Sequence, residues 1–435
     1  MAQSDVVRLL SELIRINTSN PPGNEEAAVH YLEAELKNAG IRSEIYPVTP
    51  GRANILARLP GKQKGEPVVL LGHLDVVPAS DEGWVVPPFS GAVQDGYVYG
   101  RGAIDMKSQV ICHLLAFVEL AREGMVPERD VIFLATADEE VGGKAGVEHM
   151  LGKVEDLSDA SFVLSEGGCI IDEDGANHAQ VSVAEKKICQ FMIRATGTGG
   201  HASMPIKDNA NNKVVRAANR ILDHSWPFKP TPIVTKYLNG VLKGARIKNM
   251  RFRGLAEALR NKAFREFIEN HPMYNAMLRN TVTLTMLKAG EKINVIPTES
   301  AVQFDARILP AEDAERFVRQ VRKVAGREVE VVPTTGSESI PSSFNTPYFR
   351  AIAARVRKMK PHVSALPFLT TGATDLRYFR NMGIIAYGFF PMTLTRDELF
   401  RMHGINERIS VENLEAALAG TIEIVKSLAT YSPPV

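Results

Sequence analysis

Histidines and carboxylates follow a series of short apolar runs in this chain, where strands are expected to give way to loops. The side chains that share this placement are His73, Asp75, Asp105, Glu139, Glu140, Glu166 and His403. Two imidazoles with several carboxylates are ligands that suit zinc and its first-row neighbours, and the set is too rich in nitrogen for calcium. A bridging carboxylate can hold two such ions roughly 3.5–4 Å apart, close enough to share one hydroxide. The pattern predicts a two-metal hydrolytic site.

Neighbouring residues of this set need different tasks. Glu139 and Glu140 are consecutive, so their side chains point apart on a strand, and one can bind metal while the other takes a proton from water. Asp75 follows His73 by two residues and points the same way on an extended segment, where it can accept the second imidazole proton. Asp105 is the candidate for the bridge. Any one of these groups alone is more often a hydrogen-bonded loop residue; their joint occurrence favours the metal site.

Such a set requires strands whose ends meet at one edge of a sheet. Apolar runs at about 54–59, 68–71, 131–137 and 162–165 alternate with helical stretches, one of them at 107–122. Strands that are apolar throughout predict an α/β fold with a mostly parallel sheet and helices on both faces. Ligands bind at the carboxyl ends of the strands in such sheets. The predicted ligands should therefore converge although they lie far apart in the sequence.

A different order of elements begins near Glu185. A strand, a helix, two strands, a helix and a strand are expected at 188–195, 211–222, 282–288, 301–308, 312–324 and 328–332. This is the order of a small split βαβ sandwich. We expect a catalytic domain formed by 1–184 and 335–435, with an inserted α+β lid at 185–334. Its extended segment, about 225–280, carries basic residues interrupted by glutamates, which indicates a solvated helical face and not a nucleic-acid site.

Length and composition narrow the class of protein. The chain has 435 residues, 45% of them hydrophobic and 23% charged, with a formal net charge of +1. It is too long for one ordinary core, and its near-neutral charge provides no field for nucleic acid or an anionic membrane. The sequence shows no basic leader followed by an apolar run and no apolar stretch of about 18 residues. Three cysteines favour a reducing compartment, so we expect a soluble cytoplasmic protein.

The motifs at 72–78, 100–107, 138–140, 165–167, 200–203 and 403–404 together resemble the di-zinc peptidase and amidohydrolase family. That family includes carboxypeptidase G, aminoacylase, acetylornithine deacetylase, succinyl-diaminopimelate desuccinylase and carboxypeptidase S. The similarity spans nearly the whole chain. It implies a zinc-aminopeptidase-like catalytic domain, an inserted ferredoxin-like lid that often dimerises, and two Zn²⁺ per subunit, with Co²⁺ or Mn²⁺ as alternatives.

The resemblance also implies a role for each residue. His73, Asp105 and Glu166 would serve one ion, and Glu140, His403 and the bridging Asp105 the other. Glu139 would be the general base and Asp75 would orient His73. His201 would donate to the developing oxyanion, from its own subunit or its neighbour. Asn294 and Arg307 match lid residues that hold the substrate carboxylate, and the loop with Thr371 and Gly372 looks like the segment that contacts the substrate.

These features favour a metal-dependent hydrolase that cleaves an amide or peptide bond next to a free carboxylate, with a small-molecule substrate such as an N-acyl-amino acid or a dipeptide. We expect a homodimer formed through the lid, with no nucleic-acid or membrane partner. A specific deacylase of acetylornithine or succinyl-diaminopimelate is the alternative within this class. A catalytically inactive relative that binds metal or peptide is the alternative from another class, although no ligand or base is missing here.

Overall fold

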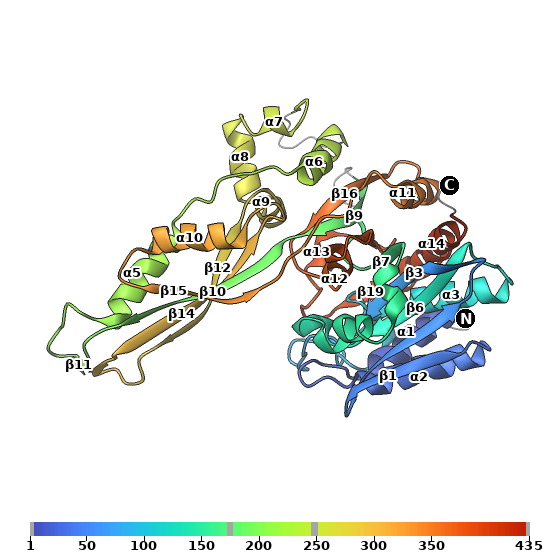
Figure 1. Cartoon of the computed structure of the whole chain (residues 1–435), viewed down its shortest axis with the longest axis horizontal. Helices are drawn as coiled ribbons and strands as arrows, with labels where there is room; N and C mark the ends of the chain where they lie inside the picture. Colours follow the sequence, from blue (N-terminus) through green and yellow to red (C-terminus); the bar gives the residue numbers. More distant parts are fainter. Residues whose placement is uncertain (1–3, 172–176, 245–250, 432–435) are drawn as a thin grey trace.

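Two sheets of different construction organise the chain, and both are visible in the computed structural model (Figure 1). The structure describes residues 4–171, 177–244 and 251–431. The larger sheet runs in the order β1-β2-β6-β3-β7-β17-β9-β8-β18, and β16 pairs with β9 off this path. Its strands are β1 (Ser43–Thr49), β2 (Arg52–Leu59), β3 (Gln63–His73), β6 (Arg129–Thr136), β7 (Phe162–Ser165), β8 (Ile170–Ile171), β9 (His178–Glu185), β16 (Ser364–Thr370), β17 (Ala386–Gly388) and β18 (Thr393–Leu394). The central strands β6, β3, β7 and β17 run parallel, as predicted.

Both faces of this sheet are covered, which explains why its strands are apolar throughout. Along β3, Val68 and Leu70 join one buried cluster, whereas Val69 and Leu71 join a second cluster on the opposite face. The first cluster includes residues of α1 (Asp5–Arg15), α2 (Glu25–Asn38), α3 (Lys107–Arg122), α11 (Pro347–Met359) and α14 (Val411–Ala429). The second includes residues of α4 (His149–Leu151), η3 (Glu155–Asp159) and α12 (Leu376–Asn381). This confirms the predicted α/β class with helices on both faces.

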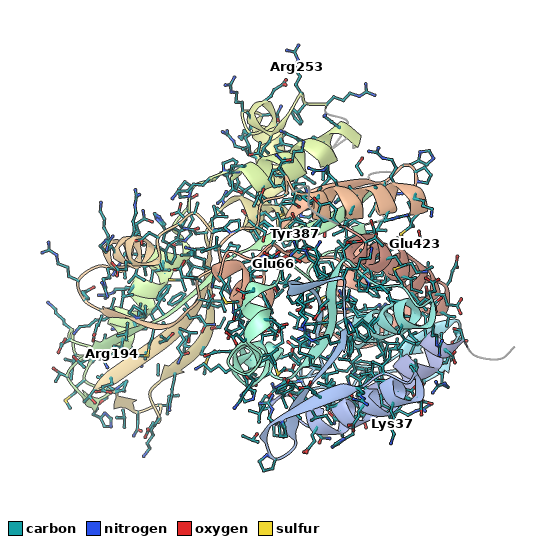
Figure 2. All side chains as sticks on the ribbon, turned by 45° about the vertical axis from the view of Figure 1, so that its right-hand side comes forward. Lys37, Glu66, Arg194, Arg253, Tyr387 and Glu423 are labelled. Carbon is teal, nitrogen blue, oxygen red and sulfur yellow. The ribbon has the colours of Figure 1, made fainter. Side chains whose placement is uncertain are left out.

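The remaining short elements around the large sheet lie near the edge where its parallel strands end, or beside that edge. They are η1 (Glu139–Val141), η2 (Lys144–Glu148), α13 (Arg396–Leu399) and a three-stranded sheet of β4 (Val93–Gln94), β5 (Tyr97–Tyr99) and β19 (Arg408–Ser410). Tyr387 of β17 is fully buried, and Figure 2 shows it in the interior while Arg194 and Arg253 reach outward from two other parts of the chain.

The second sheet is antiparallel and has the order β12-β14-β10-β15. Its elements follow the predicted sequence of strand, helix, two strands, helix and strand: β10 (Lys187–Thr196), α5 (Ala210–Leu222), β12 (Thr281–Ala289), β14 (Glu299–Ile308), α10 (Ala314–Ala325) and β15 (Glu330–Gly336). Phe191 and Ile193 of β10 are buried in a separate core with residues of α5 and α10. We call this sheet and its two helices the lid. A small ladder of β11 (Gly200–His201) and β13 (Val295–Ile296) forms the lid tip, at the end farthest from the large sheet (Figure 1).

Among the described residues between α5 and β12, four helices interrupt the lid. They are α6 (Pro232–Gly244), α7 (Leu255–Ala258), α8 (Lys262–Glu269) and α9 (Pro272–Leu278). The helix α6 packs on β16, and Tyr237 donates or accepts a hydrogen bond of 2.8 Å with His178 of β9. Buried side chains of all four helices belong to the same cluster as the large sheet. The segment of α6 to α9 therefore packs against the large sheet, beside the place where the chain passes from that sheet into the lid.

Candidate metal centre

His73 stands at the carboxyl end of β3 and is 2% exposed. Its Nδ1 lies 2.9 Å from the main-chain oxygen of Asp75 and 3.5 Å from the carboxylate of the same residue. If Nδ1 donates its proton to that main-chain oxygen, Nε2 keeps its lone pair and faces Asp105. The ring is thus oriented by Asp75, and the main-chain oxygen is nearer than the carboxylate that the sequence suggested.

Asp105 lies between the two imidazoles. One carboxylate oxygen is 3.2 Å from Nε2 of His73, and the other is 3.1 Å from Nε2 of His403. The two oxygens of one carboxylate thus face two different rings, as a bridging ligand requires. The backbone of His403 has φ of 59°, a conformation that is uncommon outside glycine and is concentrated at functional sites.

Three glutamates complete the cluster. Glu140 Oε1 is 3.4 Å from His403 Nε2, and Glu166 Oε1 is 3.8 Å from His73 Nε2. Two groups have ligand atoms that all lie within 4.8 Å of one another: His73 with Glu139 and Glu166, and His73 with Asp105 and Glu140. The structure therefore brings together all five predicted ligands and the predicted base, from loops that are up to 330 residues apart in the sequence.

The carboxylate of Asp75 holds the turn that carries the two adjacent glutamates. Its oxygens accept hydrogen bonds from the main-chain amides of Glu139 (3.0 Å) and Glu140 (3.1 Å) and from the side-chain amide of Asn20 (2.8 Å). Asp75 is fully buried. One aspartate thus orients the histidine through its main chain and the glutamate turn through its side chain.

A buried ion pair that was not predicted from the sequence holds the other half of the centre. Arg101 donates to Glu407 at 2.6 Å and to the main-chain oxygen of His403 at 3.2 Å. The second oxygen of Glu407 accepts three main-chain amides of the loop 102–105, including that of Asp105 at 3.1 Å. In the sequence, only their positions could have pointed to these two residues. Arg101 lies within the motif at 100–107, and Glu407 follows His403 by four residues.

The charges of this cluster act strongly on one another. Burial, together with the negative charge of Asp105, raises the pKa of Glu166 to about 7. Burial and the charge of Glu166 raise the pKa of Glu139 well above its usual range. Hydrogen bonds to Asp105 and Glu140 raise the pKa of His403 to about 10, and the pKa of His73 is also raised, because the surrounding carboxylates outweigh its burial.

These residues fit the cations that the resemblance implies. Glu140 Oε1 is buried, and its 3.4 Å ion contact with His403 Nε2 is the one polar contact found for it among the described residues. Four carboxylates lie close together with only two imidazoles beside them. In this arrangement the pKa values of both Glu139 and Glu166 are raised above the usual range of a glutamate. Divalent cations would neutralise this excess of negative charge and give Glu140 Oε1 a closer partner.

The structure places the predicted lid residues at two separate locations. His201 and Asn294 meet at the lid tip, where the amide of Ala202 donates to the main-chain oxygen of Asn294 at 3.0 Å. His201 is exposed, and its Nδ1 lies 2.7 Å from the hydroxyl of Ser203. Arg307 stands at the other end of the lid sheet, opposite Ile188, and its guanidinium contacts Asp305 at 2.7 and 3.2 Å. Within one chain these three residues are not gathered at the metal cluster.

The loop with Thr371 and Gly372 follows β16 beside the centre. Thr370, directly before it, donates to the main-chain oxygen of Gly167 at 3.1 Å, next to Glu166. Gly372 is exposed, and a side chain there would meet no neighbour. This loop therefore borders the Glu166 end of the metal cluster.

A buried network missed from the sequence supports the same loop. Arg380 and Glu185 form a fully buried ion pair of 2.9 Å, and Thr374 donates to the same glutamate at 2.8 Å. Asp375 is 3% exposed, and burial raises its pKa to about 7. Charged residues scattered through a helix and a strand end gave no pattern from which this network could be predicted.

Comparisons with known proteins agree with this geometry. The profile of Peptidase family M20/M25/M40 matches residues 69–427. The chain is 30% identical over 387 residues to the N-fatty-acyl-amino acid synthase/hydrolase PM20D1 of Mus musculus, covering 85% of this chain and 76% of the relative. It is 28% identical over 414 residues to aminoacylase-1 of Mus musculus, covering 93% and 90%.

Solved structures share the fold. An M20 family metallo-carboxypeptidase, Sso-CP2 from Sulfolobus solfataricus, superposes with a TM-score of 0.74 at 17% identity, over 98% of this chain and 99% of the other. Human carnosine dipeptidase 1 gives a TM-score of 0.68 at 17% identity, over 98% and 96%. With its profile match over most of the sequence, the chain belongs to the M20/M25/M40 family of peptidases and is a metal-dependent hydrolase of amide bonds.

Proposed function

We propose that this enzyme hydrolyses the amide bond of N-acyl-amino acids or small peptides that carry a free carboxylate next to that bond, with two Zn²⁺ ions, or Co²⁺ or Mn²⁺, per subunit. The observation that carries the proposal is Asp105, whose two oxygens face His73 and His403 at 3.2 and 3.1 Å. The names of the relatives, an N-fatty-acyl-amino acid synthase/hydrolase and an aminoacylase, support the substrate class.

In this proposal His73, Glu166 and Asp105 hold one cation, and Asp105, Glu140 and His403 hold the other. Bound there, the cations would polarise the amide carbonyl and lower the pKa of a water molecule. Glu139 takes the proton of the attacking water and passes it to the leaving nitrogen. Its carboxylate lies with His73 and Glu166 in one group whose ligand atoms are all within 4.8 Å of one another, which supports a role in contact with that water.

Asp75 keeps this base in place, since its carboxylate accepts the amides of both Glu139 and Glu140. Arg307 and the loop of Thr371 and Gly372 would bind the substrate carboxylate. The guanidinium of Arg307 donates to the carboxylate of Asp305 at 2.7 Å, and a planar guanidinium is well suited to bind a carboxylate. A substrate would therefore share this arginine with Asp305.

We also propose that the protein is a homodimer and that His201 acts in the site of the second copy. Its position at the lid tip, at the end of the lid farthest from the large sheet, supports this assignment (Figure 1). Asn294 lies beside it and would act across the same interface. A fixed donor aimed at the developing oxyanion is worth about 3 kcal/mol in the barrier.

The domain limits 1–184 with 335–435, and 185–334, remain part of the proposal. The chain passes from the large sheet to the lid sheet between β9 and β10, which supports the first limit. The segment about 225–280 is bound to the catalytic sheet through α6. No helix among the described residues has the length and hydropathy of a membrane span. The three cysteines are buried and free, which supports a cytoplasmic location.

A substrate screen tests the proposal. The zinc-loaded protein would be assayed with N-acyl-amino acids, dipeptides, acetylornithine and succinyl-diaminopimelate, while elemental analysis gives the metal content. Hydrolysis of several N-acyl-amino acids or dipeptides is the expected result. Activity confined to acetylornithine or succinyl-diaminopimelate would replace it with a specific deacylase. About two bound ions without hydrolysis of any compound would contradict it and favour an inactive binding protein.

A further inference from the structure

The turn that carries the proposed base lies just after β6, and we call its residues 138–143 the glutamate turn. Asp138 has φ of 75°, and Gly142 and Gly143 have φ of 117° and 73°, values that residues other than glycine rarely adopt. Val141, in the middle of the turn, is 56% exposed. A strained turn that faces solvent keeps one conformation only where neighbouring groups hold it.

Contacts from two directions hold the glutamate turn. At its start, the carboxylate of Asp75 accepts two main-chain amides. At its end, Arg377 and Tyr378 of α12 both donate to the main-chain oxygen of Gly142, at 2.8 and 2.7 Å. Arg377 is 7% exposed, and its guanidinium carbon lies 4.8 Å from the centre of the Tyr378 ring. Two donors, one of them charged, thus fix one oxygen of the turn.

The start of α12 also packs closely against the turn. Asp375 is 3% exposed, and a Cβ atom at Gly143 would overlap with its carboxylate. The same atom would lie 3.1 Å from the ring of Tyr378. The glutamate turn therefore has no space to shift toward α12, and the two hydrogen bonds to its oxygen oppose a movement away.

The same part of the chain holds the loop of Glu166. Thr370 donates to the main-chain oxygen of Gly167 at 3.1 Å. We call residues 370–378 the bridging segment. Glu166 follows β7 and the glutamate turn follows β6, and β3 lies between these two strands in the sheet. The bridging segment thus contacts both of the loops whose glutamates lie around His73.

The bridging segment is itself anchored in the interior. Thr374 donates to Glu185 at 2.8 Å, and Arg380 pairs with the same glutamate at 2.9 Å. Arg377 donates through its second terminal nitrogen to the main-chain oxygen of Thr374 at 2.7 Å. Its guanidinium therefore links this anchored loop to the glutamate turn.

We propose that Arg377 and Tyr378 are positioning residues of the reaction, which keep Glu139 within reach of the attacking water. They act through the main-chain oxygen of Gly142. Glu140 belongs to the same turn, but a bound cation would hold its carboxylate directly. The base has no such bond, so its position depends on the turn. This inference rests on the proposed function, which makes Glu139 the base.

The first test compares Tyr378→Phe and Arg377→Met with the wild type in kcat, KM, zinc content and melting temperature. Each variant should lower kcat by about 10–100-fold, the usual effect of a residue that orients a group of a metal site, while KM and zinc content stay nearly unchanged. Arg377→Lys keeps a charged donor and should lose less. A lower melting temperature with the kcat of the wild type in the folded protein would indicate a purely structural role and overturn the inference. Loss of zinc from Tyr378→Phe would overturn it too, because the turn would then hold a ligand and not the base.

A double-mutant cycle identifies the group on which Tyr378 acts. Tyr378→Phe would be combined with Glu139→Gln, and the residual kcat measured at high enzyme concentration. If Tyr378 acts by placing Glu139, the double variant should have about the kcat of Glu139→Gln alone, because the effects of residues that act through one group do not add. Losses that multiply would contradict the assignment.

Matched controls and the wild type separate this inference from the proposed function. Tyr46→Phe removes a hydroxyl that donates to Glu44 on the edge strand β1, and Arg220→Met removes a guanidinium that donates to the main-chain oxygen of Ala325 in the lid. Both should keep the kcat of the wild type. Absence of hydrolysis by the wild type, or full activity of Glu139→Gln, would overturn the proposed function. Full activity of Tyr378→Phe and Arg377→Met beside a slow Glu139→Gln would overturn this inference alone.

Discussion

The metal cluster and the lid tip differ in how completely one chain builds them. At the cluster, His73 and Asp75 are almost fully buried, and Asp75 and Glu407 together accept five main-chain amides that fix the surrounding loops. At the lid tip, His201 is exposed, and among the described residues its side chain forms hydrogen bonds only with Ser203. This difference indicates that one chain builds the metal cluster by itself, and it supports our proposal that His201 acts in the site of a second copy.

The largest effect is expected in the buried region around the metal cluster. Arg380→Met would leave Glu185 buried without its ion-pair partner. Glu185 lies at the end of β9, where the chain passes into the lid. Removal of one member of a buried ion pair costs about 3–5 kcal/mol. Urea denaturation should show a loss of this size, and the double variant with Glu185→Met should recover part of it. Loss below about 1 kcal/mol for the single variant would show that this network does not hold the catalytic loop.

The lid tip gives the next largest effect. His201→Ala should lower kcat by about 10²–10³-fold, because it removes a donor to the oxyanion, while metal content stays unchanged. If His201 acts in the second copy, mixing this variant with Glu139→Gln should restore activity, since each mixed dimer contains one intact site. Ser203→Ala serves as the control for disturbance of the loop. Normal activity of His201→Ala, or no recovery on mixing, would contradict the proposed exchange between copies.

A smaller effect is expected where a side chain acts through its neighbours. Asp75→Asn keeps the size of the side chain but weakens its hold on the turn of Glu139 and Glu140. Residues that position metal ligands typically contribute 10–100-fold in metal affinity or activity, so a loss of about this size is expected in a zinc titration. Asp130→Asn is the matched control, because Asp130 also accepts a main-chain amide, that of Gly61, away from the cluster.

The smallest effect is a dependence on pH. Without metal, the raised pKa of Glu166, about 7, means that the folded state binds its proton more tightly than the unfolded state does, so stability falls as pH rises from about 4.5 to about 7. His403, with its pKa raised to about 10, stabilises the fold below about 6.5 and loses this contribution as pH rises toward 10. Both signs agree, so each group stabilises the metal-free fold at acidic pH and less so as pH rises.

Added zinc should therefore raise the melting temperature more at pH 8 than at pH 5.5, since protons compete with the metal for the same ligands. Calorimetry on the metal-free and zinc-loaded protein measures the difference. An equal zinc effect at both pH values would show that the carboxylates and imidazoles of the cluster are not the ligands.

The sequence predicted the parallel core because its runs are apolar on both faces, as β3 shows. It did not predict β9 and β16, two paired strands of the large sheet. β9 alternates polar and apolar residues, the pattern of a half-buried strand, yet all of its residues are buried, so it differs from the apolar runs used to find the parallel core. β16 contains Pro367, which argues against a strand. The packing of α6 on β16 was also missed, because an amphipathic helix shows which face is buried but not against which partner.

The same limit applies to the site. The ligands could be predicted because strand ends of one sheet must meet, which places His73 and Glu166 near each other. The supporting residues Arg101 and Glu407 could not, because their pairing depends on loops that no periodic pattern describes. The position of His201 could not be predicted either, since whether a lid residue reaches its own site depends on the direction of the whole lid.

The Glu139→Gln variant tests the central claim most directly, through metal content and turnover measured on the same sample. The amide keeps the size of the side chain but cannot accept the proton of water, so we expect the wild-type metal content and a loss of kcat of about 10²–10⁴-fold. Glu155→Gln, an exposed position in η3, should behave as the wild type. Near-normal turnover of Glu139→Gln with its metal retained would contradict the assignment of Glu139 as the base of this centre.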